Sequence, residues 1–336
     1  MATMILGPGG RGKTGVGRWT TAPTLGRVKP PPIRREAIQN WLGGDAVVVG
    51  IGRRVALTGG ATARVIERVE ILYRTGECSC RVEVVAKRAT AGEVAALSSL
   101  DVVDPVFPEL IDRGVDEDGP WIVVPFEVGG AIGWTVEPPG VVYAALARLH
   151  LRHLGRVDEL PAEIPKVDEQ FLRSAFTGFA PGGIAKAVAR HGQHAVLDRA
   201  LEMLARFAEE ERLLLGLEVL PATLIHGDVY GDNVIASEPS PRLIDWGSAR
   251  VGPGMLDVVM AGRRAGMAAY KEAWMKEAGT PIDEWLAATG AAWATAVSNA
   301  TFVGATAERS VEVAELMVEE AEEAVERLGE LLSRRP

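Results

Sequence analysis

The segment between residues 224 and 260 constrains the fold more than any other part of the sequence. It reads Leu-Ile-His-Gly-Asp228, reaches Asn233 five positions later, and then runs through a second short apolar stretch to Asp245. A carboxylate after a turn-forming His-Gly and an amide on the same loop can face one point. The second apolar run predicts a strand whose end opens toward that point. The spacing therefore predicts that Asp228, Asn233 and Asp245 lie together.

These three side chains supply what phosphoryl transfer asks of a protein. Such a reaction needs a group that accepts the proton of the attacking hydroxyl, and oxygen ligands that hold Mg²⁺ against the phosphates. Asp228 is a candidate for the first task, and Asn233 and Asp245 are candidates for the second. The alternative is that His-Gly-Asp228 is only a turn and that Asp245 only ends a strand.

The same residues carry a resemblance to a known family. The motifs His226-Gly227-Asp228, Asn233 and Ile244-Asp245-Trp246 resemble the catalytic signature of aminoglycoside phosphotransferases and choline kinases. These families are similar in fold to protein kinases. The resemblance, strongest to the antibiotic phosphotransferases, implies Asp228 as catalytic base, Asn233 and Asp245 as Mg²⁺ ligands, and ATP or GTP as phosphoryl donor.

The resemblance also implies a fold and a division of the chain. The fold would be α+β and bilobal, like a protein kinase, with a small N-terminal antiparallel sheet lobe and a larger, mainly helical C-terminal lobe. We expect a nucleotide-binding lobe over residues 33–127 and a catalytic and acceptor-binding lobe over residues 128–336. In the second lobe, Gly252-Pro253-Gly254 and Asp257 resemble the family segment whose aspartate braces the catalytic loop.

Apolar periodicity predicts the elements of the N-terminal lobe. Residues 34–42 predict a short helix. The segments 47–49 and 55–57 predict strands that frame turn-rich stretches, and residues 64–73 and 78–87 alternate as the two strands of a hairpin. The lobe is therefore expected to be built on a sheet of hairpins.

A glycine-containing segment lies between two of these strands. It consists of Thr58, Gly59, Gly60, Ala61 and Thr62. Glycines at such a turn let backbone amides approach a phosphate more closely than side chains could. The segment resembles the Ser-Gly-Gly-x-Ser nucleotide loop of the phosphotransferase family, which implies contacts to the nucleotide phosphates. A tight hairpin turn is the alternative.

Lys87 ends the strand that follows, where its amine can reach the α and β phosphates of a nucleotide. Glu93 stands in a segment that looks like the family helix carrying the partner of this lysine. An ion pair between them would hold the lysine extended toward the nucleotide. This chain departs from the family pattern, because only five residues separate Lys87 from Glu93. The alternative for Lys87 is a solvated lysine at a strand end.

The run from Trp121 to Glu127 predicts a strand that leads into the hinge between the lobes, and we expect Val124 and Phe126 to contact the nucleotide base there. Pro125 has no N–H to donate. The backbone donor to the base must therefore be a neighbour such as Phe126 or Glu127. Whether the base is adenine or guanine stays open.

The C-terminal lobe is expected to be helical from Val141 onward. Residues 166–219 predict two or three helices, with a break at Pro181-Gly182-Gly183. His150 is assigned packing or capping rather than chemistry. Three tryptophans, Trp274, Trp285 and Trp293, are interpreted first as core residues. A contact with the acceptor is the alternative.

The first residues contain a rival phosphate motif. Residues 7–14 read Gly-Pro-Gly-Gly-Arg-Gly-Lys-Thr and match the P-loop pattern. A working P-loop follows a buried strand and opens a helix, whereas only six residues precede this one, and Gly15, Gly17 and Pro23 follow. We therefore interpret residues 1–32 as a basic, irregular arm.

Charge and composition limit the partners. The net charge is −9, but the first 40 residues carry +6, so the remaining chain carries −15. An acidic body disfavours nucleic acid and weakly favours a cationic acceptor. No apolar run is long enough to cross a bilayer, no secretory pattern opens the chain, and Cys78 and Cys80 do not suit a disulfide. We expect a cytoplasmic enzyme without a membrane or nucleic-acid partner.

Three questions stay open. The apolar seam of the last helix, from Val311 to Leu332, favours packing on the lobe over a dimer contact, so a monomer and a homodimer are both compatible. The acceptor is a small molecule with a hydroxyl group, with an antibiotic as first choice and a sugar, nucleoside or choline-like amino alcohol as alternatives. A nucleotide-binding module without turnover, or an arm that recruits an acidic partner, are the other hypotheses.

Overall fold

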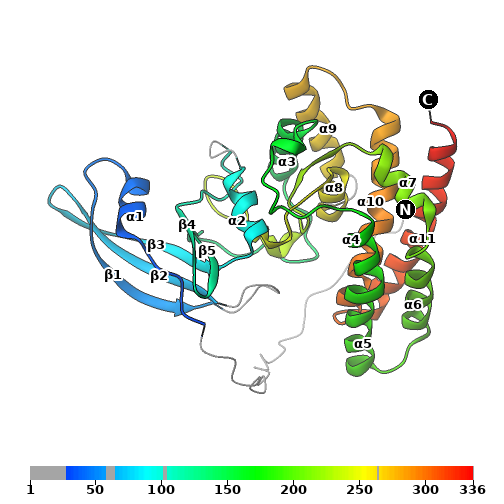
Figure 1. Cartoon of the computed structure of the whole chain (residues 1–336), viewed down its shortest axis with the longest axis horizontal. Helices are drawn as coiled ribbons and strands as arrows, with labels where there is room; N and C mark the ends of the chain where they lie inside the picture. The colour runs from blue at the N-terminus through cyan, green and yellow to red at the C-terminus, as the bar shows by residue number, and fades with distance from the viewer. Residues whose placement is uncertain (1–27, 58–64, 101–103, 263–264, 336) are drawn as a thin grey trace, which may run out of the picture.

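The N-terminal strands form one five-stranded antiparallel sheet in the computed structural model, which describes residues 28–57, 65–100, 104–262 and 265–335 (Figure 1). Its order is β1-β2-β3-β5-β4. The strands are β1 (Val47–Ala56), β2 (Ile66–Thr75), β3 (Cys78–Arg88), β4 (Asp112–Asp116) and β5 (Gly119–Pro125).

One face of this sheet is covered by α1 (Arg35–Leu42), whose Ile38 is fully buried among Val69, Ile71 and Val84. Beyond β3, the short helix α2 (Ala91–Ser98) begins where the Thr90 side chain accepts a hydrogen bond from the Glu93 N–H. This N-cap starts the helix within three residues of the strand end and carries Glu93 back toward β3.

The edge strand β1 differs from the prediction of two short strands around a turn-rich stretch. It runs unbroken for ten residues, with register shifts against β2 between Val48 and Gly50 and between Ile51 and Arg54. Glycines in a strand often mark such bulges rather than turns. The residues that suggested a turn therefore lie at irregular pairing within one strand.

The C-terminal lobe is mainly helical, with two small sheets that carry its loops (Figure 1). The helices are α3 (Gly140–His153), α4 (Glu169–Ser174), α5 (Ala180–His191), α6 (Ala195–Phe207), α7 (Glu211–Val219), α8 (Met255–Ala261), α9 (Ala265–Ala278), α10 (Glu284–Ala307) and α11 (Val311–Ser333). The strands pair as β6 (Ala222–Ile225) with β9 (Arg250–Pro253) and β7 (Val234–Ile235) with β8 (Arg242–Leu243). The predicted α+β, bilobal, kinase-like fold is confirmed.

The predicted break at residues 181–183 is wrong. α4 continues through a π-helical turn, Ala175–Phe179, directly into α5, and Pro181 lies in the first turn of α5. Proline has no N–H to donate to the preceding turn, and Pro181 stands directly after the π-helical turn, where the α-helical hydrogen-bond pattern is already interrupted. Gly183 lies where α5 crosses α10, with an added Cβ meeting the Gly304 backbone at 2.7 Å. Close helix packing explains this glycine.

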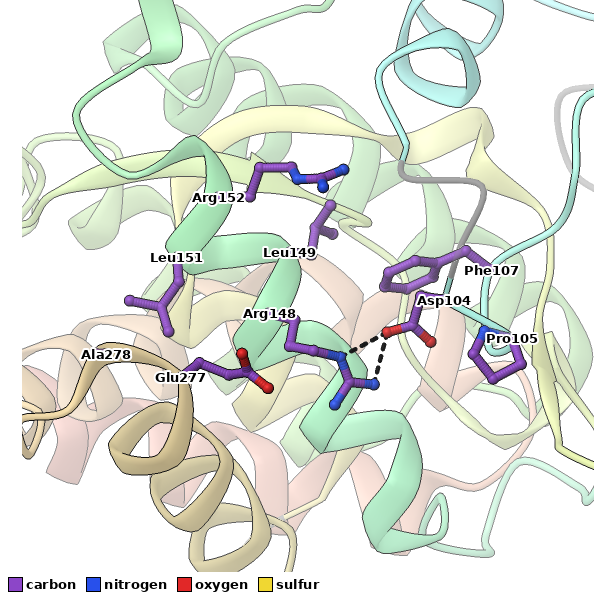
Figure 2. A pocket seen from close by; sticks show the side chains of 9 residues that line it. All are labelled: Asp104, Pro105, Phe107, Arg148, Leu149, Leu151, Arg152, Glu277 and Ala278. Carbon is purple, nitrogen blue, oxygen red and sulfur yellow. Dashed lines mark hydrogen bonds and ion pairs between the residues drawn. The ribbon is translucent and has the colours of Figure 1, made fainter.

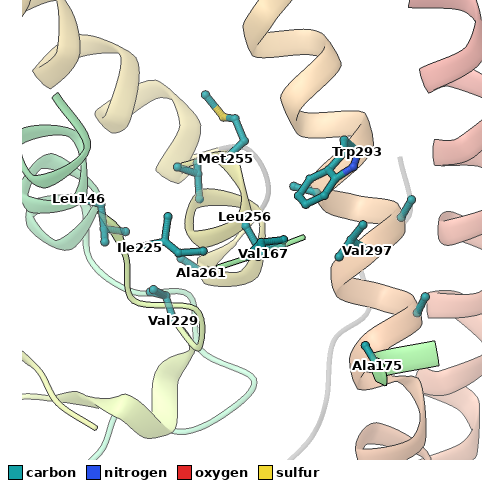
Figure 3. Close-up of a cluster of buried hydrophobic side chains, with 14 of the residues drawn as sticks. Leu146, Val167, Ala175, Ile225, Val229, Met255, Leu256, Ala261, Trp293 and Val297 are labelled. Carbon is teal, nitrogen blue, oxygen red and sulfur yellow. The ribbon is translucent and has the colours of Figure 1, made fainter. Parts of the chain in front are cut away.

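The core of this lobe lies between α3, α8 and α10 (Figure 3). Trp293 is fully buried and donates its indole N–H to the Leu213 carbonyl, and Trp285 donates to the Leu331 carbonyl. Trp274 packs on Tyr270. These three tryptophans serve core packing, which agrees with the first interpretation of the sequence.

The seam of the last helix also packs within the chain. Ala314, Val318, Ala321 and Leu328 of α11 are buried in the core that α10 shares. Among the described helices, none combines the length and apolarity that a bilayer crossing demands.

Candidate active site

Two backbone contacts bring Asn233 and Asp245 to the same place. β7 and β8 pair with Val234 opposite Leu243, and the ladder extends by a hydrogen bond from the Ile244 N–H to the Asn233 carbonyl at 2.9 Å. Asn233 therefore precedes one strand of this hairpin and Asp245 follows the other. Antiparallel pairing places such positions at one end of the ladder.

The loop that carries Asp228 is held by the buried carboxylate of Asp257, in the first turn of α8. This carboxylate accepts hydrogen bonds from the backbone N–H groups of His226 and Gly227, each at 2.8 Å, and contacts His150 Nε2 at 3.2 Å. Gly227 has φ +76°, and an added Cβ would lie 2.4 Å from the Ser248 carbonyl oxygen. Asp257 and a glycine together define this turn. His150 packs here, in line with its expected role.

Asp228 faces Asn233 across the loop. Asn233 Nδ2 donates to the Asp228 carbonyl at 2.8 Å and to its Oδ2 at 3.1 Å. Burial raises the pKa of Asp228 to about 7, against the hydrogen bond from Asn233 and the positive charge of Arg309, which lower it. A carboxyl group with a pKa near neutrality can take a proton from a hydroxyl and release it again at neutral pH.

Asp245 has the one positive φ among the described non-glycine residues, with φ 60° and ψ 69°. Such a conformation is uncommon and persists where the surroundings hold it. Here the next residue, Trp246, is buried with its ring edge-on to Phe107 and His226, at centroid distances of 5.4 and 4.7 Å. The tryptophan therefore anchors the backbone that presents the Asp245 carboxylate.

Lys87 joins the two lobes. Its Nζ lies 2.8 Å from Glu93 Oε1 and 2.6 Å from Asp245 Oδ1, and the lysine is only 7% exposed. Burial lowers the pKa of the Lys87 ammonium, but the two carboxylates outweigh this effect and raise the pKa above its ordinary value. Burial raises the pKa of Asp245, but the ammonium outweighs it, so that pKa is lowered overall. The short connection between Lys87 and Glu93 thus still permits contact.

The donors suit a magnesium ion bound largely by phosphates and water. Within the described residues no group of three or more His, Cys, Asp or Glu could hold a metal ion alone. Mg²⁺ in nucleotide sites is held through one or two carboxylates together with phosphate oxygens, so it needs no larger protein cage. An amide oxygen from Asn233 and a carboxylate from Asp245 on adjoining strand ends fit that requirement.

The predicted hinge residues lie at the end of β5 and directly after it. The Phe126 N–H donates to the Glu83 carbonyl at 3.0 Å and continues the sheet, so Phe126 is not the free backbone donor that the hinge requires. Glu127 is the other candidate. Val124 pairs with Val85 within the sheet. The predicted phosphate loop, Thr58 to Thr62, and the rival motif at residues 7–14 lie outside the described residues.

A further cluster, which no pattern in the sequence indicates, lies near Asp228. Arg309, after α10, contacts Asp232 of the catalytic loop and the ring of Trp134, which lies between the hinge and α3. These three residues are separated by long stretches of chain, and no periodicity links them. The connection between α10 and α11, which carries Arg309, brings them together.

A cavity of about 730 Å³ lies away from these residues, between α3, the end of α9 and the segment at Asp104 (Figure 2). Arg148 lines it and pairs with Asp104. Phe107, which lines it, is the residue that packs on Trp246. The cavity is thus separate from the candidate catalytic groups but shares a wall with the residue that anchors Asp245.

Comparison with known proteins gives a family match and a fold match. The sequence profile described as the phosphotransferase enzyme family matches residues 73–298. Choline kinase from Cryptosporidium parvum Iowa II is 11% identical over 84% of this chain and 90% of that one, with a TM-score of 0.53. A choline/ethanolamine kinase family protein from Mesorhizobium loti is 14% identical over 83% and 88%, with a TM-score of 0.47. At these identities the first structure shows the fold alone. No curated protein sequence matches the chain.

Proposed function

This chain belongs to the phosphotransferase enzyme family, and on that premise we propose that it transfers the γ-phosphoryl group of ATP or GTP to a hydroxyl group of a small molecule. The observation that supports the proposal most is the Lys87 ammonium between Glu93 and Asp245, beside the loop that holds Asp228 and Asn233. This arrangement supports the proposal because it gathers in one region a cation that could bind phosphate, a candidate base and two oxygens that could bind a metal.

Each residue has a task in the proposed reaction. Asp228 would orient the acceptor hydroxyl and take its proton as the oxygen attacks the γ phosphorus. Lys87, held by Glu93, would bind the α and β phosphates and keep them in line. Asn233 and Asp245 would hold Mg²⁺, which supplies neutralisation of the phosphate charge. Most of the acceleration would come from alignment and electrostatic stabilisation.

Nucleotide contacts at the mouth of the site complete the proposal. The segment Thr58, Gly59, Gly60, Ala61 and Thr62 would cover the phosphates with backbone N–H groups. The base would lie against the hinge at Val124, with Glu127 as the backbone donor, because the Phe126 N–H is engaged by Glu83. Phe126 would then contact the nucleotide through its side chain and not through its backbone N–H.

The acceptor we propose is an antibiotic, phosphorylated by a cytoplasmic enzyme and thereby inactivated or protected. Related phosphotransferases in complex with spectinomycin and with kanamycin are among the solved structures that match this chain, at TM-scores of 0.42 and 0.44, which carry no argument about the acceptor. The antibiotic therefore rests on the resemblance of the catalytic motifs. If the acceptor is instead a metabolite, a screen of acceptors would reveal it.

A panel of hydroxyl-bearing compounds tests the proposal. It contains antibiotics, sugars, nucleosides and amino alcohols, each incubated with Mg²⁺ and ATP or GTP, and the nucleoside diphosphate released is measured. We expect release above the water background with at least one acceptor class, and none with Asp228→Asn. Equal release by the two proteins with every compound would sink the proposal. Lys13→Ala is the control for the rival motif and should leave release unchanged.

A further inference from the structure

An arginine reaches the catalytic loop from the far end of the chain. Arg309 Nη1 lies 3.5 Å from Asp232 Oδ2, and its guanidinium carbon lies 5.5 Å from the ring centre of Trp134. The Arg309 side chain is 50% exposed, and Trp134 is 40% exposed. The guanidinium therefore rests on an aromatic platform with a carboxylate at one edge, and half of it faces solvent.

This cluster lies beside the candidate base. Asp232 is four residues beyond Asp228 on the same loop. The loop packs tightly against the segment that carries Trp134, since a Cβ added to Gly231 would lie 2.0 Å from the Gly133 carbonyl oxygen. The positive charge of Arg309 also acts on Asp228 and Tyr230, where it lowers the pKa of each against a larger effect of burial.

Fold stability does not account for the position of Arg309. An ion pair at 3.5 Å between two partly exposed side chains adds little to stability, because water screens it. A guanidinium has five N–H donors, and among the described residues Asp232 is the one that accepts a hydrogen bond from this group. The other cation beside the site, Lys87, is already shared by Glu93 and Asp245. Arg309 thus keeps an unused donor edge next to Asp228.

We infer that Arg309 binds an anionic group of the acceptor, a carboxylate or a phosphate, while Trp134 and Asp232 hold its guanidinium in position. The planar fork of arginine matches such groups with two parallel hydrogen bonds. The acceptor class is then a hydroxyl compound that carries an acid group. This inference rests on the proposed kinase function and reverses the weak preference for a cationic acceptor that the acidic body suggests.

Local electrostatics agree with this choice. The Arg309 guanidinium brings a positive charge to this edge of the site, and Asp232, the carboxylate that contacts it, is already engaged by that charge. A cationic group would instead meet the Arg309 charge directly and would have to displace it from Trp134 and Asp232.

Malonate, a dicarboxylate without a hydroxyl group, is the probe for this subsite. We would titrate it into the MgADP-bound protein and follow the indole N–H resonance of Trp134, assigned by its loss in Trp134→Phe. Malonate should shift this resonance with saturation, and Arg309→Gln should weaken binding about tenfold or more, with partial recovery in Arg309→Lys. Arg327→Gln, which removes a half-exposed arginine paired with Glu330 on α11, should change nothing.

Two outcomes would overturn the inference. Equal malonate affinity in the wild type and Arg309→Gln, or no shift in either, would show that no anion subsite exists at Arg309. A Trp134 shift by tetramethylammonium that appears only in Arg309→Gln would show a cation subsite that Arg309 fills. Asp228→Asn should abolish transfer yet keep malonate binding. Malonate binding through Arg309 without transfer to any acceptor would instead reject the kinase function and leave the subsite standing.

Discussion

On the proposed nucleotide side of the candidate site, the buried Lys87 lies 2.8 Å from Glu93 and 2.6 Å from Asp245, whereas on the proposed acceptor side the half-exposed Arg309 lies 3.5 Å from Asp232. The first cation is enclosed by two carboxylates from two lobes. The second is held loosely and keeps unused donors. The two sides of the site therefore differ in how much of their geometry is set before any ligand arrives.

The difference follows from what each side must do. Every reaction of this kind presents the same triphosphate, so the chain can fix Lys87 and Asp245 in advance and lose little by it. Acceptors vary in shape and charge, and a loosely held arginine can adapt to them. We call the side with Lys87 the tight side and the side with Arg309 the loose side.

The largest effect should come from the base. Asp228→Asn keeps the shape and the contact to Asn233 but cannot accept a proton, so transfer should fall roughly 10³- to 10⁴-fold. Nucleotide affinity, which depends on the tight side, should stay within about twofold. Single-turnover release of nucleoside diphosphate and calorimetric nucleotide titration measure the two quantities. Full turnover in this variant would remove Asp228 from the mechanism.

A second large effect concerns the support of the base. Asp257→Ala leaves the N–H groups of His226 and Gly227 without an acceptor, and the free energy of unfolding should fall by about 3 kcal/mol. The matched control is Asp283→Ala, which removes an exposed N-cap of α10 and should lower it by about 1 kcal/mol. Urea unfolding followed by circular dichroism compares them. Equal losses would mean that the loop does not depend on Asp257.

The pH dependence of stability gives a third effect. The pKa of Asp228 is about 7 in the folded chain and 3.8 ordinarily, so its ionisation opposes folding. The protonated Asp228 carboxyl stabilises the folded chain fully below about pH 4, and this stabilisation is lost as the pH rises through about 7. Asp228→Asn, which does not titrate, should therefore be as stable as the wild type at pH 4 and about 4 kcal/mol more stable at pH 8.

Thermal unfolding across this pH range measures the difference. A constant difference between the two proteins would show that Asp228 has an ordinary pKa. The same ionisation governs the proposed reaction, so the wild-type rate should rise with pH through about 7.

A smaller effect is expected at the metal-binding oxygen of the tight side. Asp245→Asn keeps the shape but removes the charge that Mg²⁺ and Lys87 share, so nucleotide affinity in the presence of Mg²⁺ should fall roughly tenfold. Glu67→Gln, which removes the partner of Arg54 on the outer strands, is the control and should have no effect. Titrating nucleotide with and without Mg²⁺ separates the metal-dependent part of the affinity from the metal-independent part. Unchanged metal dependence would exclude Asp245 from the site.

The smallest effect concerns the arm. The buried Arg88, next to Lys87, donates to the Lys29 carbonyl from Nε at 3.0 Å and from Nη2 at 2.9 Å. Removing residues 1–27 keeps these contacts, whereas removing residues 1–31 should destabilise the sheet by about 1 kcal/mol. Thermal unfolding of the two truncations measures this. Equal stability would mean that residue 29 does not support β3.

The sequence was most informative where local spacing and chemistry coincide. Asp228, Asn233 and Asp245 lie near one another because a short hairpin links them, and Lys87 meets Glu93 because a helix cap follows the strand directly. Their roles in catalysis stay predictions that the variants above test. The fold class is shown independently by a solved structure of similar architecture.

Features that depend on distant packing were beyond the sequence. Phe126 is excluded as a free donor only by the register between β3 and the residues after β5. The helix through residues 181–183 continues because α10 packs against it, although Pro-Gly-Gly favours a break. Arg309 has no local signal at all, since its partner Asp232 is 77 residues away.

Asp257 has a consequence for how relatives of this chain can diverge. One carboxylate on α8 contacts His150 on α3 and two successive amides of the loop that carries Asp228, so two segments that are remote in sequence depend on a single acceptor. A substitution at this position is tolerated only together with a new acceptor for the amides and a new partner for the histidine. Positions 150 and 257 should therefore change together among relatives, even where the residues on the proposed acceptor side differ.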